Sequence, residues 1–401
     1  MSNPTQTPID FPLPKPETIF HPSAELSRLQ RTSPVVPFRT ADGRTGWLVT
    51  RYEDVRQVLV DPRFSRAEAG RPGVPDPGLG QASAESILGM DPPEHTRLRR
   101  LVAGAFTARR VEALRPRVTE LVHDLIDHLT ALDQPADLVE NFSLPLPVQV
   151  ICELLGVPPE DRHMFHAWSD GVLSAADHPE RIATAFADLT AYFQKLIALK
   201  RKLPADDLMT ALIAARDDKD RLSEEELVRL GLTILVAGHE TTANQINLFL
   251  INLHEYPDQL ARLRANPGTI PQAVEELMRF VQLGPGGAGL VRVLKEEMTL
   301  SGVRLPAGSA VVPVMSIANR DPLLVSDPDR LDVSRPIGGH LGFGAGVHHC
   351  LGAQLARVEL QEALHGLLTR LPGLRIDVPP TELRFKDGMI LRSLHSLPVR
   401  W

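Results

Sequence analysis

Cysteine is scarce in this sequence, because only Cys152 and Cys350 occur among its 401 residues. Two cysteines cannot form the several disulfides of a small secreted scaffold, and they indicate a reducing compartment. Cys152 lies in the mostly apolar segment 150–155, which predicts a small buried core residue. Cys350 follows a glycine-rich segment and is the more informative of the two.

Long hydrophobic runs are also missing. No apolar stretch approaches the roughly 18–20 residues that span a bilayer. The first five residues, Met1 to Thr5, show neither the basic nor the apolar region of a signal peptide. We therefore expect a soluble, cytoplasmic protein with no membrane partner.

The charge balance gives no sign of a nucleic-acid partner. The formal net charge is −7, whereas nucleic-acid binders usually carry a basic balance or a basic patch. A local basic face for an acidic protein partner is still compatible with this charge. Internal repeats and low-complexity linkers are likewise not found in the sequence.

The composition and the apolar spacing predict a globular chain that is mainly α with a minor β part. Hydrophobic residues make up 43% and charged residues 23%, as in ordinary globular proteins. Apolar residues recur at helical spacing from Asp91 to about Ile270. We predict one domain, 1–401, consisting of an extended arm over 1–35, short strands then a helix over 36–62, a loop over 66–87, helices over 91–270, a helix over 272–280, strand-like structure over 283–335, a helix over 351–371 and short strands over 373–401.

The strongest signal is the segment 343–357, which reads FGAGVHHCLGAQLAR. A cysteine at the start of a helix faces the positive end of the helix dipole, which favours the thiolate. Glycines before it, such as Gly344, let backbone N–H groups approach the sulfur, and Gly352 leaves a flat surface for a planar macrocycle. A thiolate ligand donates electron density to haem iron and favours cleavage of the O–O bond. A zinc site is disfavoured because no second cysteine or histidine cluster lies at ligand spacing.

This segment resembles the haem-ligand signature of cytochromes P450 at every fixed position, from Phe343 through Gly344, His348 and Cys350 to Gly352. The resemblance extends over essentially the whole chain from Trp47. It implies a cytochrome P450 fold, a triangular helical prism with haem b between the distal and proximal helices. It also implies that Cys350 is the axial ligand of the haem iron, as in soluble actinobacterial members of the family.

A second signal, LVAGHETT over 235–242, lies inside a helical pattern from Ser223 to about Leu253. A mid-helix glycine weakens a helix, and a threonine hydroxyl can bind the carbonyl four residues earlier and bend it. Ala237, Gly238 and Thr241 could thus open a local bulge with room for dioxygen. The segment resembles the distal-helix motif of P450s, which implies that Thr241 guides proton delivery and that Glu240 is its acid partner.

Two further sets of residues match the family. Glu276 and Arg279 share a helix face and resemble the P450 Glu-x-x-Arg pair, and Arg330 lies where a third, supporting arginine is found. A solvated surface pair is the alternative for such a common motif. Haem propionates need cations, and the residues that match the family's propionate partners are His95, Arg99, Arg292 and His348. Arg97 and Arg100 are basic residues that could instead face an acidic redox partner.

One segment departs from the family pattern. Residues 283–290 include four glycines where P450s place bulkier apolar residues. Small residues here could widen the pocket, or the segment could simply be a flexible connection. The predicted pocket walls are residues 66–90, 165–185, 232–241, 283–292 and 393–394. They are mainly apolar and small, which favours a bulky hydrophobic secondary metabolite such as a polyketide, a macrolide or a cyclic peptide.

The sequence thus predicts a monooxygenase that hydroxylates or epoxidises such a substrate with one oxygen atom from O2. Flavin and nicotinamide fingerprints are not found, so electrons from NAD(P)H should arrive through a ferredoxin and its reductase. We expect a monomer. Oxidative coupling or ring formation without oxygen insertion needs the same haem site and stays open. A non-catalytic P450-like scaffold is a further alternative, disfavoured because Cys350, Thr241 and Glu276 are all present.

Overall fold

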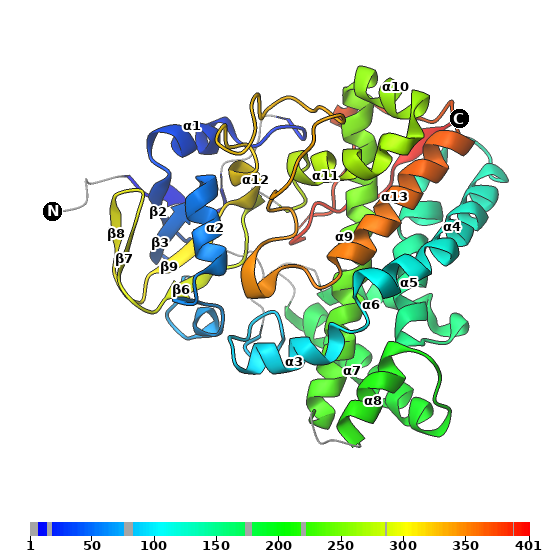
Figure 1. Cartoon of the computed structure of the whole chain (residues 1–401), viewed down its shortest axis with the longest axis horizontal. Helices are drawn as coiled ribbons and strands as arrows, with labels where there is room; N and C mark the ends of the chain where they lie inside the picture. Colours follow the sequence, from blue (N-terminus) through cyan, green and yellow to red (C-terminus); the bar gives the residue numbers. More distant parts are fainter. Residues whose placement is uncertain are drawn as a thin grey trace. The chain divides into compact units, whose positions relative to one another are not determined.

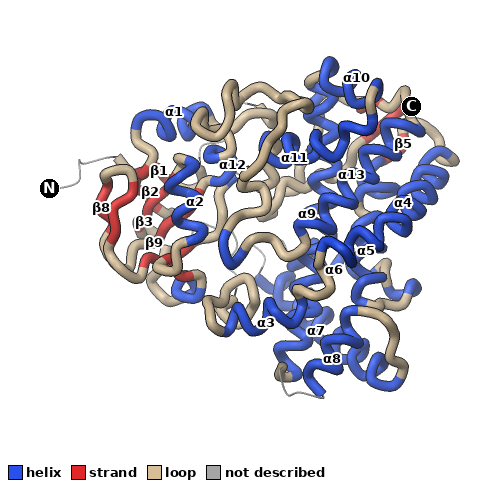
Figure 2. The backbone as a smooth tube through the Cα atoms, in the orientation of Figure 1, coloured by secondary structure: helices blue, strands red, loops and turns tan. Residues whose placement is uncertain are grey.

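A computed structural model describes residues 7–13, 18–75, 83–172, 179–217, 222–284, 287–387 and 389–401. The chain forms two compact units, one of residues 1–94 and 272–350 and the other of residues 95–271 and 351–401. The expectation of a single domain stays a prediction. Among the described residues, helices are the main element and strands a minor part, as predicted (Figures 1 and 2). In this part of the chain no helix combines the length and the apolar character needed to cross a membrane.

The first unit contains a six-stranded mixed sheet. Its strands follow the order β1 (Ile9–Asp10), β2 (Val35–Arg39), β3 (Thr45–Val49), β9 (Ala310–Pro313), β6 (Arg292–Leu294) and β4 (Phe64–Ser65). The β2–β3, β9–β6 and β6–β4 pairs are antiparallel, whereas β1–β2 and β3–β9 are parallel. The strands predicted over 36–62 and 283–335 therefore belong to one sheet, and the register brings Ser65 opposite Val293.

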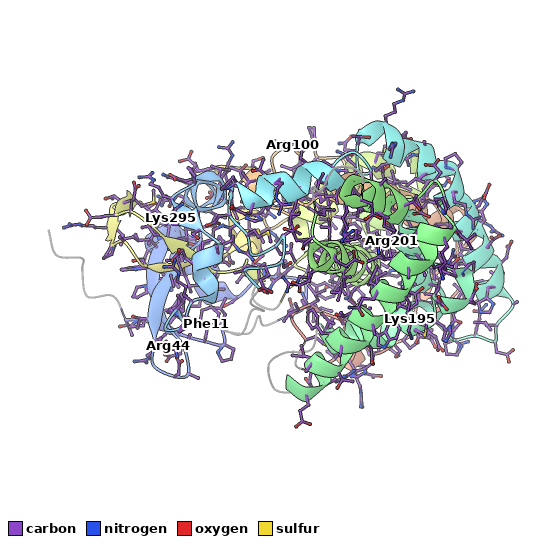
Figure 3. The ribbon with its side chains drawn as sticks, turned by 90° about the horizontal axis from the view of Figure 1, so that it is seen from below. Phe11, Arg44, Arg100, Lys195, Arg201 and Lys295 are labelled. Carbon is purple, nitrogen blue, oxygen red and sulfur yellow. The ribbon has the colours of Figure 1, made fainter. Side chains whose placement is uncertain are left out.

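Apolar residues cover this sheet in two clusters. One cluster contains Phe11 and Phe38, whose rings meet edge to face with centroids 5.0 Å apart (Phe11 is labelled in Figure 3). The other contains Phe64 and Leu294. The unit also contains the helices α1 (Ala24–Thr32), α2 (Tyr52–Val60) and α12 (Met315–Ala318), the hairpin β7 (Met298–Leu300) with β8 (Val303–Leu305), and α11 (Ile270–Phe280) from its third residue onward.

The prediction of an extended arm over 1–35 is wrong for residues 24–32, which form the helix α1. This helix begins after Ser23, and its residues Leu26 and Leu29 are buried in the first apolar cluster. A nine-residue helix with two core side chains gives too short a periodic pattern to stand out among the prolines around it.

The second unit is mainly helical. Its helices are α3 (Glu94–Val102, from its second residue), α4 (Ala108–Thr130), α5 (Pro145–Leu155), α6 (Met164–Val172), α7 (Pro179–Lys202), α8 (Leu208–Asp217), α9 (Glu224–Glu255), α10 (Pro257–Ala265) and α13 (Ala353–Arg370). A small antiparallel sheet joins β10 (Arg375–Ile376), β11 (Pro398–Arg400) and β5 (Ala136–Asp137). Cys152 is fully buried in α5, as predicted.

The long helix α9 crosses the centre of this unit and packs against α5, α7 and α13 (Figure 1). Ser223 caps it: the Ser223 hydroxyl accepts from the Glu226 N–H, and the Glu226 carboxylate accepts from the Ser223 N–H. This capping box satisfies two backbone donors at the helix start. Most residues from Leu227 to Leu253 are buried on all sides of the helix, as in a helix at the core of a large protein.

Candidate functional site

The loop before α13 presents the thiol of Cys350. The Cys350 N–H donates to the Phe343 carbonyl at 2.9 Å, and the residue is exposed. Gly344 and Gly346 adopt φ angles of +70° and +71°, in the left-handed region that favours glycine. A Cβ on Gly346 would lie 2.5 Å from the Leu59 carbonyl oxygen, so the turn admits no larger residue there without a shift.

Small and aromatic residues flank the cysteine in the chain. Gly352 is the N-cap of α13, two residues beyond Cys350, and a Cβ built on it meets no atom within 4 Å. His348 ends a short 3-10 turn two residues before Cys350. Phe343 packs near the rings of His340 and His349, with centroids 5.9 and 6.4 Å away. The glycine turn before the cysteine is formed as predicted, whereas the flat surface at Gly352 stays a prediction.

Thr241 in α9 forms the predicted hydrogen bond to the backbone of its own helix. Its Oγ1 donates to the Ala237 carbonyl at 2.7 Å. Ala237 is exposed and Gly238 and Thr241 are partly exposed, although the flanking residues of the helix are buried. The predicted bulge is not formed, because the α-helix is continuous from Glu224 to Glu255. Gly238 instead serves packing, since a Cβ there would lie 2.9 Å from the side chain of Ile151 in α5.

Glu240 is buried in a polar cluster that the sequence did not reveal. Its Oε1 accepts hydrogen bonds from Asn244 Nδ2 and Ser393 Oγ, both at 3.2 Å. Asn244 Nδ2 also donates to Ser393 Oγ at 2.9 Å. Oε2 accepts no hydrogen bond from any residue that the structure describes, and His239 Nε2 lies 3.7 Å from it. The cluster therefore fixes one oxygen of the carboxylate and leaves the other available.

The predicted propionate partners on α3 are placed one helical turn apart. His95 is buried, and Arg99 is partly buried. Arg97 forms an ion pair with Glu226, the residue that also takes part in the capping box of α9. Arg97 is thus engaged within the protein, whereas Arg100 is exposed on the outer side of α3 (Figure 3).

Another predicted propionate partner, Arg292, is the first residue of β6 in the first unit. It is only 4% exposed, and its guanidinium donates to the Leu290 carbonyl at 3.3 Å. Burial, together with the nearby charge of Arg66, lowers the pKa of Arg292 to about 9. A second buried arginine beside Arg292 was not predicted, because nothing in the pattern after Phe64 distinguishes Arg66 from a surface residue.

The supporting network around Glu276 differs from the prediction in one member. Arg279 Nε and Nη2 donate to the two Glu276 oxygens at 2.7 Å each, and both side chains are fully buried. The third cation is Arg335, whose Nε donates to Glu276 Oε1 at 3.2 Å. The prediction of Arg330 is wrong, because Arg330 is exposed and offers its backbone carbonyl to Arg279 and Arg335 instead.

The glycine-rich segment that departs from the family packs closely against its own unit. Gly287 adopts φ +65°, and a Cβ there would lie 1.7 Å from Ser316 Oγ. A Cβ built on Gly289 would lie 3.2–3.3 Å from atoms of Met315 and Pro313, and Ala288 forms a bridge with Val314. Close packing and the positive φ thus require glycine at 287 and leave little space for a side chain at 289. Residues 285–286 of this segment lie outside the described residues, as do 76–82 and 173–178 of the predicted pocket walls.

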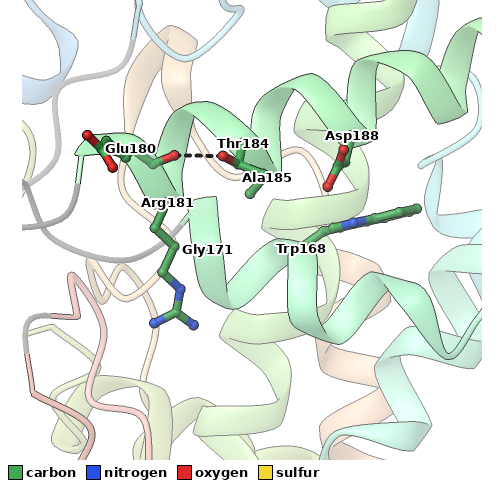
Figure 4. A pocket seen from close by; sticks show the side chains of 7 residues that line it. All are labelled: Trp168, Gly171, Glu180, Arg181, Thr184, Ala185 and Asp188. Carbon is green, nitrogen blue, oxygen red and sulfur yellow. Dashed lines mark hydrogen bonds between the residues drawn. The ribbon is translucent and has the colours of Figure 1, made fainter.

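A hollow of about 320 Å³ lies between α6 and α7. Trp168 and Asp188 line one end of it and Glu180 and Arg181 the other (Figure 4). Thr184 lies between them and donates to the Glu180 carbonyl at 2.9 Å. The hollow is lined by part of the predicted pocket wall 165–185 and by none of the predicted catalytic or haem-binding residues.

The residues present fit a haem group. Cys350 offers an exposed sulfur in a glycine turn, and the accessible stretch of α9 at Ala237 breaks an otherwise buried helix. Arg292 is a buried cation, and buried cations need an anionic partner. A thiolate ligand, a surface for a flat ring and a cation for a carboxylate are the three groups that haem requires from a protein.

Comparisons with known proteins agree with this chemistry. Residues 173–389 match the family model described as Cytochrome P450. The chain is 50% identical over 375 residues to nocardicin C N-oxygenase of Nocardia uniformis subsp. tsuyamanensis, which covers 93% of this chain and 94% of the relative. It is 50% identical over 380 residues to mycinamicin IV hydroxylase/epoxidase of Micromonospora griseorubida, with 94% and 95% covered. The crystal structure of cytochrome P450mel 107F1, described as having biaryl coupling reactivity, superposes with a TM-score of 0.88 at 40% identity, covering 94% and 96% of the two chains.

Proposed function

This chain belongs to the cytochrome P450 family and is a P450 monooxygenase, and from that premise we propose that it hydroxylates or epoxidises a bulky hydrophobic secondary metabolite. The observation that carries the proposal is the exposed Cys350 in its glycine turn, combined with 50% identity to mycinamicin IV hydroxylase/epoxidase and to nocardicin C N-oxygenase. Its relatives also include an N-oxygenase and a protein with biaryl coupling reactivity. Coupling without oxygen insertion is therefore the second candidate function.

Haem b is the cofactor of the proposal. The Cys350 thiolate would ligate its iron, and His95, Arg99, Arg292 and His348 would bind its propionates. When bound, haem supplies the reduction and activation of dioxygen, with electrons from NAD(P)H through a ferredoxin and its reductase. Phe343, Gly344 and Gly352 of the cysteine loop, and Ala237 and Gly238 of α9, are the other residues that would help to hold the haem.

The chain's own part in the chemistry is to hold and move protons. Glu240 Oε1 is fixed by Asn244 and Ser393, so the carboxylate presents Oε2 as the oxygen that takes up and releases a proton. Thr241 Oγ1 is the adjacent hydroxyl, and a rotation that breaks its bond to Ala237 frees it to donate. A positioned acid of this kind typically contributes about 10²–10⁴-fold to the rate of a proton transfer.

The cofactor assignment is tested with the reduced, carbon monoxide-treated protein beside a Cys350→Ala variant. We expect the red-shifted Soret band of a thiolate-ligated haem in the wild type and its loss in the variant. A wild type that binds haem without this band would favour the scaffold function.

The reaction is tested with mycinamicin IV and nocardicin C as probes, scored first by the haem spin-state shift and then by product mass. A gain of one oxygen supports monooxygenation, whereas a loss of two hydrogens supports coupling. If only small polar compounds shifted the spin state, the proposed substrate class would be wrong.

A further inference from the structure

Arg66 directly follows strand β4 and is a buried charge whose guanidinium has no hydrogen-bond partner among the described residues. Its side chain is only 7% exposed. Its guanidinium makes no hydrogen bond to any residue that the structure describes, and its Nε is fully buried. Burying a charged group without a hydrogen bond is among the costliest arrangements in a protein. A side chain in this state indicates a partner outside the residues that the structure describes.

Arg66 lies near a second buried cation, Arg292. Strand β4 ends at Ser65, which pairs with Val293, so Arg66 directly follows this pairing in the chain and Arg292 directly precedes it. Arg66 itself has helical backbone angles and is the N-cap of the 3-10 turn Ala67–Gly70. The positive charge of Arg66 lowers the pKa of Arg292, and Arg292 uses only one donor, toward the Leu290 carbonyl.

One nearby carboxylate does not balance the pair. Asp91 accepts from the Ser65 hydroxyl and, at 2.8 Å, from the Arg66 backbone N–H. It therefore holds the backbone of the turn and makes no hydrogen bond with either guanidinium. Two arginines and one aspartate leave a net charge of +1 in a largely buried place. Burial lowers the pKa of Arg66 to about 10, although the charge of Asp91 opposes this shift.

We propose that Arg66 and Arg292 together bind one carboxylate, a propionate of haem, which makes Arg66 a haem-anchoring residue. The proposal rests on the proposed haem binding and extends the predicted propionate partners by the residue that follows strand β4. The planar fork of an arginine suits a carboxylate, and two neighbouring arginines can bind it together. The bound carboxylate neutralises the excess charge and relieves the repulsion between the two guanidinium groups.

The test measures how firmly the ferric holoprotein holds haem. Wild type, Arg66→Gln and Arg66→Lys are mixed with excess apomyoglobin, and the transfer of haem is followed in the Soret region. We expect Arg66→Gln to release haem roughly tenfold faster or more, which corresponds to the loss of a hydrogen bond to a charged group. Arg66→Lys keeps the charge without the fork, so its rate should lie between the two.

The matched control is Arg63→Gln. Arg63 lies three residues earlier and pairs with Asp61 at 2.6 Å, with 37% of its side chain exposed. Its rate of haem release should equal that of the wild type. Resonance Raman spectra of the same samples give a second readout, because the propionate bending band should shift in Arg66→Gln and not in Arg63→Gln. A purely structural role for Arg66 would not move this band.

Each remaining outcome opposes the proposal in a recognisable way. If haem release and the propionate band are unchanged in Arg66→Gln, Arg66 does not bind a propionate. If they are unchanged and the variant has also lost the spin-state response of the wild type to decanoate, the pair binds a substrate carboxylate instead of haem. A wild type without a thiolate-ligated haem spectrum would refute the proposed function itself, before any variant is compared.

Discussion

Replacing Arg335 by glutamine tests the corrected network around Glu276, with Arg330→Gln as the matched control. Arg335 Nε donates to Glu276 Oε1 at 3.2 Å, and Glu276 is fully buried. Losing a hydrogen bond to a charged group costs about 1.5–3 kcal/mol. Arg330 is exposed and contributes its backbone carbonyl, which glutamine keeps, so its replacement should stay within about 0.5 kcal/mol of the wild type.

Arg279→Met should lower the free energy of unfolding more than either of these two substitutions. Arg279 supplies two hydrogen bonds of 2.7 Å to Glu276 and one each to the carbonyls of Asn319 and Pro328. Removing one partner of a buried ion pair costs about 3–5 kcal/mol, because the other charge stays buried. Urea unfolding of the haem-loaded protein, followed by far-UV circular dichroism, measures all three variants. The reasoning fails if Arg330→Gln lowers the midpoint as much as Arg335→Gln does.

The other predictions concern the proton path and two buried acids. Thr241→Val should divert electrons to hydrogen peroxide, measured as peroxide formed per NAD(P)H consumed; an unchanged ratio would contradict a role for the hydroxyl. Ser393→Ala removes a donor to Glu240 Oε1 and should slow product formation several-fold with a larger solvent isotope effect, and a normal isotope effect would argue against positioning. Glu359 is buried and has no hydrogen-bond partner among the described residues, and burial raises the pKa of its carboxyl well above the ordinary value. As the pH rises, the carboxyl of Glu359 loses its proton in the unfolded chain before it does so in the folded protein, which lowers the stability of the wild type relative to Glu359→Gln. The melting temperature of Glu359→Gln minus that of the wild type should therefore be larger at about pH 7.5 than at about pH 4. The same difference at both pH values would show that Glu359 does not titrate this way. Burial also raises the pKa of the Cys152 thiol to about 12, so iodoacetamide at about pH 8 should leave it unmodified in the native protein, as peptide mass spectrometry would show.

Local features were predictable from the sequence because they depend on residues that are close along the chain. The capping residue Ser223, the bond from Thr241 to Ala237 and the glycine turn before Cys350 all follow from spacings of four residues or fewer. The Glu276–Arg279 pair is of the same kind, since i, i+3 residues share a helix face. These short spacings fix geometry through the helix or the turn itself.

Features that failed or were missed depend on contacts across the chain. Arg335 and Arg330 are equally basic and five residues apart in an irregular segment, where no period decides which of them turns toward Glu276. Ser393 meets Glu240 across 153 positions, which no local pattern encodes. Asn244 could have been found, because it lies four residues after Glu240 on the same helix face.

The carboxylate of Glu226 serves two partners that require different chemistry. The capping box needs only an acceptor oxygen at this position, which a glutamine also provides. The ion pair with Arg97 needs the negative charge. Glu226→Gln would therefore remove the ion pair between α3 and α9 while keeping the first turn of α9 intact. A substitution at position 226 can thus change the mobility of α3, which carries His95 and Arg99, without unwinding α9, which carries Thr241.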